Sequence, residues 1–149
     1  MKISWTSLKI SIAGARLSHL VQKDRIWDHG SMAEQARIIF HLVHKAKAGG
    51  NMESLQKQCS FSCFKKIEAE IAMGESGKST IITPIIRELA IIDVQPGKNN
   101  KPDMFWSLIR YHIKETMNGI DTIDRSKEFI AKWCFIRQGD WWMLDEIKR

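Results

Sequence analysis

Long apolar runs are missing from this sequence. A membrane-spanning helix needs about 18 or more consecutive apolar residues, and Lys, Arg, Asp or Ser interrupts every candidate stretch. We therefore expect a chain that does not cross a bilayer. Its 149 residues, 44% hydrophobic and 27% charged, are typical of one globular domain with a single core, and they exclude disordered and collagen-like classes.

Cysteine is also scarce. Cys59, Cys63 and Cys134 are an odd number of cysteines in a chain too long to depend on disulfide bonds, so we expect free thiols and a reducing compartment. Cys59 and Cys63 could be combined with His41 and His44 as the four ligands of a zinc ion. Because a free cysteine commonly behaves as a small buried apolar residue, we instead expect no metal site and no cofactor.

Acidic residues are absent from the start of the chain, where Lys2, Lys9, Arg16 and Lys23 recur every seven positions. On a helix this spacing drifts by only about 20° per step, which would align the four as one basic stripe. Trp5 stands beside the stripe, where an interfacial aromatic lies on a membrane-surface helix. Since the whole chain carries a formal charge of +6, we expect these five residues to bind an acidic membrane surface or protein partner.

The conformation of this basic segment, residues 1–23, stays open from the sequence. Serine, threonine and glycine are frequent in it and are poor helix formers, and Leu8, Ile10 and Ile12 alternate with polar residues as in a strand. We divide the chain into this segment and a domain over residues 24–149.

Helical patterns dominate the next part of the chain. Ser31 with Glu34 forms a capping box, which predicts a helix start at Ser31. An apolar face at helical spacing follows and comprises Ala36, Ile39, Phe40, Val43 and Ala46. Glycines 49 and 50 predict its end. We expect a short helix over residues 52–58 and a third after Ser60, with Phe61, Phe64, Ile67 and Ile71 on one side and an end at residues 74–77.

The apolar period then changes to two, which indicates strands. We expect strands over residues 85–94, 104–113, 128–137 and 141–147, with turns at Asn118-Gly119 and Gln138-Gly139-Asp140. In the second strand, Phe105, Ser107, Ile109, Tyr111 and Ile113 would share one face. Helices followed by about four strands predict an α+β fold in which N-terminal helices pack on a curved antiparallel sheet.

The end of the chain resembles the closing hairpin of the Tim-forty-four-like family. The pattern is Trp-x-Phe, a turn and Trp-x-Leu-x-x-Ile, which Trp133, Phe135, Trp142, Leu144 and Ile147 match. The helix over residues 36–48, with Phe40 facing inward, is similar to the family's opening helices, so the resemblance covers roughly residues 23–149. It implies a cone-shaped, nuclear-transport-factor-two-like domain with an apolar pocket, which we expect to be lined by Phe40, Ile109, Tyr111, Trp133, Phe135 and Trp142.

The resemblance also implies a non-catalytic domain that binds a membrane, lipid or protein, as in protein transport. It places the chain in a bacterial cytoplasm or mitochondrial matrix, with peripheral attachment to the inner membrane as one option. The resemblance also allows an apolar small ligand to bind in this pocket. Fold does not fix function, so the import-motor role itself does not follow.

Two alternatives from other classes remain. The same architecture hosts isomerases and dehydratases, and Tyr111, the only tyrosine, with Glu115 or His112 would be the acid-base candidates. The positive charge also suits ribosomal RNA, but the predicted sheet lacks a contiguous basic and aromatic motif. We therefore expect no catalytic residues and rank RNA below an acidic membrane or protein partner.

Overall fold

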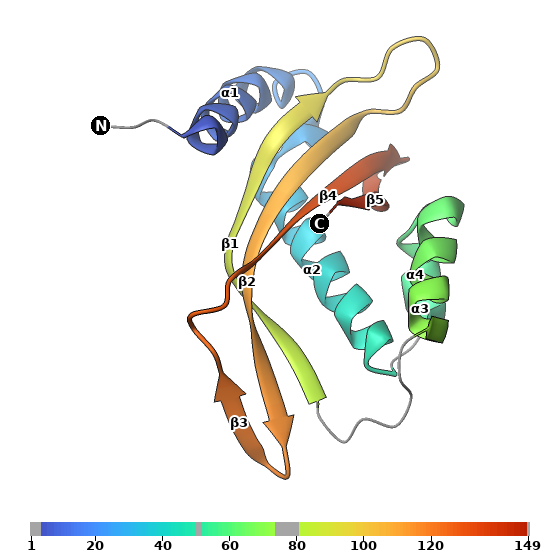
Figure 1. Ribbon diagram of the computed structural model, residues 1–149. Helices are drawn as coiled ribbons and strands as arrows, with labels where there is room; N and C mark the ends of the chain where they lie inside the picture. The colour runs from blue at the N-terminus through green and yellow to red at the C-terminus, as the bar shows by residue number, and fades with distance from the viewer. Residues whose placement is uncertain (1–3, 50–51, 74–80, 149) are drawn as a thin grey trace.

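A computed structural model describes residues 4–49, 52–73 and 81–148 (Figure 1). Over these residues the chain forms helices α1 (Trp5–Leu20), η1 (Arg25–Trp27, a 3-10 helix), α2 (His29–Lys47), α3 (Met52–Lys57) and α4 (Phe61–Met73), then strands β1 (Ile81–Gln95), β2 (Met104–Met117), β3 (Ile120–Ile123), β4 (Phe129–Gln138) and β5 (Trp141–Lys148). The predicted end of the third helix at residues 74–77 lies outside the described residues. None of the described helices is long and apolar enough to cross a membrane.

The strands form one open antiparallel sheet in the order β1-β2-β4-β5, and β3 pairs with the far end of β2. The predicted α+β class, with N-terminal helices packed on an antiparallel sheet, is therefore confirmed. The described sheet has five strands rather than about four, because the Asn118-Gly119 turn returns the chain into the short strand β3. Both turn residues have positive φ, 54° and 76°, as a tight two-residue hairpin requires.

Helices lie on both sides of the bent sheet (Figure 1). We call the face that packs on α2 the inner face and the opposite one the outer face. The inner face supplies buried side chains such as Phe105, Ile109 and Phe135, which form one core with Ile39 and Phe40 of α2. α1 lies across strand β1 at the edge of the sheet, on the side away from α2.

The first helix resolves the conformation of the N-terminal segment. Ser4 caps α1 by accepting a hydrogen bond from the Ser7 backbone N–H at 3.1 Å. Ala13 and Leu17 are 2% and 3% exposed and belong to the same core as the rest of the chain. These apolar contacts favour the helix over the strand-like alternation of Leu8, Ile10 and Ile12.

The start of α2 differs from the prediction. The helix begins at His29, and Asp28 is its N-cap, because the Asp28 carboxylate accepts a hydrogen bond from the Ser31 backbone N–H at 2.9 Å. This bond lowers the pKa of Asp28. Ser31 therefore lies within the first turn rather than at the cap. The predicted end of the helix is confirmed, since Gly49 has a φ of 97° just beyond Lys47.

One predicted core residue of α4 is exposed. Phe61, the first residue of the helix, is 77% exposed, and Cys63 is buried in its place. Cys63 and Ile67 are separated by four residues, so they share a helix face, whereas Phe61 points away from the core.

Candidate basic groove on the outer face

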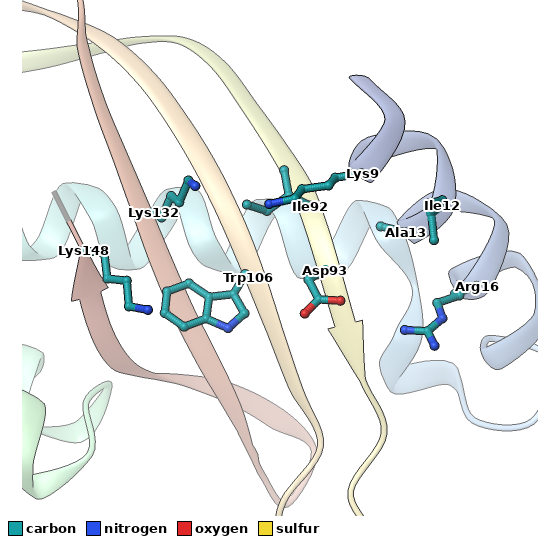
Figure 2. A pocket seen from close by; sticks show the side chains of 9 residues that line it. All are labelled: Lys9, Ile12, Ala13, Arg16, Ile92, Asp93, Trp106, Lys132 and Lys148. Atoms are coloured by element: carbon teal, nitrogen blue, oxygen red, sulfur yellow. The ribbon is translucent and has the colours of Figure 1, made fainter. Parts of the chain in front are cut away.

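A groove of about 450 Å³ lies between α1 and the outer face of the sheet. Figure 2 shows it with α2 behind the sheet, so the groove and α2 lie on opposite faces. It is lined by Lys9, Ile12, Ala13 and Arg16 of α1, Ile92 and Asp93 of β1, Trp106 of β2, Lys132 of β4 and Lys148 of β5. Ligand cavities in proteins span roughly 300–1,000 Å³, so the groove is large enough to bind a ligand or part of a partner.

One side of α1 forms one wall. Lys9, Ile12, Ala13 and Arg16 are separated by three, one and three residues, which places them along the same side of a helix. Ala13 is almost fully buried, so α1 approaches the sheet closely here. The Arg16 guanidinium donates a hydrogen bond to the Val94 carbonyl oxygen at 3.0 Å and links the helix to β1.

The floor depends on strand register. Trp106 pairs with Asp93 on β1, and Lys132 of β4 pairs with Lys148 of β5. The β1–β2 register shifts between Ile91 and Asp93, and such a bulge changes the direction of a side chain. As a result the neighbouring residues Ile92 and Asp93 both line the groove, although neighbours in a regular strand would point to opposite faces.

The charge in the groove is strongly unbalanced. Four cationic side chains line it, and Asp93 is the single carboxylate. None of the four forms an ion pair with a described residue; the Lys148 ammonium instead lies 4.9 Å from the centre of the Trp106 ring, a cation–π contact. A cleft lined by charges of one sign concentrates ligands of the opposite sign.

Another basic cluster on the sheet is neutralised. Arg110 forms ion pairs of 3.3 Å with both Glu88 and Glu128, and Arg87 also pairs with Glu128. The arginines lower the pKa of Glu128, so the cluster stays paired at neutral pH. These two arginines are therefore neutralised, whereas Lys132 and Lys148 at the groove form no ion pair with a described residue.

An exposed apolar row continues from the groove along α1. Trp5, Leu8 and Ile12 are 79%, 42% and 52% exposed, and Ile12 also lines the groove. We call these three side chains the α1 apolar row. The surface therefore combines apolar and cationic groups side by side.

The structure brings together two of the five residues predicted to bind an acidic partner. Lys9 and Arg16 line the groove, and Trp5 is exposed at the start of α1. Lys23 is exposed beyond the end of α1 and does not line the groove. Lys2 lies outside the described residues.

The sequence reasoning missed the sheet half of the site, namely Asp93, Trp106, Lys132 and Lys148. A partial signal was present. Strand alternation puts Trp106 on the face opposite to Phe105, and Lys132 on the face opposite to Trp133, which is the outer face in the structure. Their proximity follows only from the pairing of β2 with β4 and of β4 with β5.

The six residues predicted to line an apolar pocket meet in the core. Phe40 contacts the rings of Tyr111 and Trp133, each with ring centres 5.1 Å apart. Ile109, Phe135 and Trp142 are also buried there. Neither the basic groove nor a second pocket beside the start of α2 is lined by any of the six. In this structure these side chains fill the space between α2 and the sheet.

The groups considered for chemistry do not converge on one point. Tyr111 and Glu115 lie on the same face of β2, but four residues of strand separate them by about 13 Å. A ring nitrogen of His112 lies 2.8 Å from the Lys127 carbonyl oxygen. Among the described residues, no group of three or more His, Cys, Asp or Glu side chains is arranged to hold a metal ion.

The three cysteines are free and buried. Burial, with a smaller contribution from Asp145 and Glu146, raises the pKa of Cys134 to about 12. Contact with the Cys63 thiol raises the pKa of Cys59. At neutral pH Cys134 and Cys59 are therefore protonated, which suits apolar packing better than nucleophilic chemistry.

The fold and the groove define an α+β domain with a basic, partly apolar surface site. No protein-family model matches the chain, and no curated protein matches it. The intermembrane-space region of the chloroplast protein ARC6 is similar in structure, with a TM-score of 0.52 and 11% identity over 78% of this chain and 94% of that one. The putative transfer protein TraH of a Gram-positive conjugative plasmid gives a TM-score of 0.43, with 12% identity over 77% of this chain and 91% of that one. At such low identity, the likeness to the ARC6 region concerns the fold alone.

Proposed function

We propose that this chain is a non-catalytic binding domain, of the Tim-forty-four-like type, that docks an acidic protein partner in the basic groove. The observation that carries the proposal is the convergence of Lys9 and Arg16 from α1 with Lys132 and Lys148 from the sheet around one cavity. These four cations come from positions up to 139 residues apart (148 − 9), and only one carboxylate faces them.

The shape of the site favours a protein segment over a flat membrane. The cations lie on two walls of a groove, on α1 and on the sheet (Figure 2). A planar bilayer surface would reach the rim of such a groove, whereas a protruding polypeptide segment can contact both walls. Apolar lining from Ile12, Ile92 and Trp106 adds contacts that a purely electrostatic partner would not use.

The proposal can be tested with a labelled polyglutamate peptide at low ionic strength. We expect binding that weakens as salt is added. The variant Lys9→Gln/Lys132→Gln/Lys148→Gln should lose about tenfold in affinity, since three surface charges at about 0.5 kcal/mol each sum to about 1.5 kcal/mol, and about 1.4 kcal/mol corresponds to a factor of ten. Arg16 is left unchanged because it bonds to Val94.

The matched control is Lys45→Gln/Lys57→Gln/Lys66→Gln, which removes the same charge from exposed positions on α2, α3 and α4. It should retain most of the binding. Equal losses in the two triple variants, or no binding at low salt, would show that the groove is not the site. Binding to phosphatidylglycerol vesicles without binding to polyglutamate would replace the protein partner by a membrane.

A further inference from the structure

The exposed side of α1 has the pattern of a helix-packing surface. Trp5, Leu8 and Ile12 are spaced by three and then four residues, the spacing of the apolar seam through which two helices pack side by side. In a folded domain these positions are normally buried against another element. Here they are 42–79% exposed, while Leu17, on a different side of the helix, makes contact with the core.

The basic residues of α1 occupy the flanking positions of that seam. Lys9 follows Leu8 directly, and Arg16 stands seven residues after Lys9. In paired helices, the position after the second apolar residue of each heptad holds the charges that pair with the partner helix. Both side chains are exposed and line the groove, so the charged flank of the seam lies on the side of α1 that borders the groove.

A helix packed along this seam would rest on the outer face of the sheet. Its flank would lie beside Lys9 and Arg16 and above Trp106, and its other side would face Lys132 and Lys148 across the groove (Figure 2). Trp5 to Arg16 spans about 17 Å of helix, so a partner helix of about 14 residues would cover the whole row.

We infer that the partner's docking element is an acidic amphipathic helix, whose apolar side chains pack on Trp5, Leu8 and Ile12 and whose carboxylates pair with the groove's lysines and arginine. This inference rests on the proposed function and specifies its partner. It predicts that an acidic peptide without apolar side chains binds more weakly, because such a peptide leaves the exposed apolar row uncovered. The mode is that of an amphipathic helix in a groove.

The test compares two labelled peptides of equal charge and high helix propensity. Both carry Glu at the positions flanking the seam; one has Leu at the seam positions and the other Ala. We expect the Leu peptide to bind at least tenfold more tightly than the Ala peptide. The protein variant Trp5→Ser/Leu8→Ser should reduce binding of the Leu peptide to the level of the Ala peptide.

Matched controls separate this inference from the proposed function. Ile38→Ser/Phe61→Ser removes two similarly exposed apolar side chains from α2 and α4 and should leave binding unchanged. Circular dichroism checks that both double variants stay folded.

Three outcomes would contradict the inference. If the two peptides bind equally and only the triple lysine variant weakens their binding, the amphipathic helix is wrong and the acidic docking site stands. If neither peptide nor polyglutamate binds, both are wrong. Binding to anionic vesicles alone, sensitive to Trp5→Ser/Leu8→Ser, would assign the row to a membrane and overturn the inference.

Discussion

At the scale of single residues, the two buried tryptophans of the closing hairpin, Trp133 and Trp142, differ in their hydrogen bonding. Trp142 donates a hydrogen bond from its indole N–H to the Ile26 carbonyl oxygen at 3.2 Å and contacts the rings of Trp27 and Phe105. The Trp133 indole N–H is buried and has no acceptor among the described residues. A buried donor without a partner costs about 1–3 kcal/mol, so the two rings stabilise the fold unequally.

This difference predicts unequal effects of the same substitution. Trp142→Phe removes a satisfied hydrogen bond and part of a packed ring, so we expect it to lower the free energy of unfolding by about 2–3 kcal/mol. Trp133→Phe removes an unsatisfied donor, which offsets the lost packing, and we expect a change within about 1 kcal/mol. Urea denaturation followed by circular dichroism measures both. Equal losses of unfolding free energy in the two variants would contradict the conclusion that the Trp133 indole N–H lacks a hydrogen-bond acceptor.

At the scale of elements, the N-cap Asp28 stabilises the start of helix α2. The Asp28 carboxylate accepts the Ser31 N–H and stands at the positive end of the helix dipole. The hydrogen bond holds the pKa of Asp28 below its ordinary value of 3.8. A lowered pKa in the folded state means that the unfolded chain binds the proton more readily, so acid weakens the folded state.

We expect Asp28→Ala to lower the melting temperature at pH 7, where the carboxylate is ionised. The stabilisation by Asp28 is fully present above pH 3.8 and is lost as the pH falls through the lower pKa of the folded state. The melting temperatures of the variant and the parent should therefore converge as the pH falls below 3.8 and through the folded-state pKa. Asp28→Asn, which keeps a capping oxygen, is the control and should lose less at pH 7. A difference that does not shrink in acid would indicate another origin for the effect.

At the scale of the whole molecule, α1 joins the two faces of the sheet. Its apolar row and lysine face outward or into the groove, while Leu17 reaches the core shared with α2 and Trp142. Helix α1 is thus packed on the domain and contributes to its stability, in addition to carrying candidate binding residues. Binding and folding therefore use different sides of one helix.

Leu17→Ala tests this arrangement. Because Leu17 is 3% exposed, we expect the free energy of unfolding to fall by about 2–4 kcal/mol. The control Leu8→Ala changes a side chain that is 42% exposed on the same helix and should change stability by less than about 0.5 kcal/mol. Chemical denaturation of the two variants makes the comparison. Similar values would mean that α1 is not part of the cooperative unit.

Local sequence determined much of the architecture. The change from helical spacing to alternation marks where the sheet begins, because side chains on a half-buried strand must alternate between core and solvent. Asn118-Gly119 and Gly49 set a turn and a helix end, since few residues other than glycine and asparagine adopt positive φ without strain. The α+β class followed from these short-range patterns.

Tertiary contacts decided the features that bear on function. The first helix forms because Ala13 and Leu17 find a core to pack in, and no local rule separates it from a strand. The predicted pocket residues fill the interior because facing side chains interdigitate, which an alternating pattern does not reveal. The groove joins Lys9 to Lys148 through strand register and one β-bulge. Strand pairing joins residues that are far apart in the sequence. Short-range spacing patterns do not specify which strands become neighbours, so the groove could be found only in the tertiary structure.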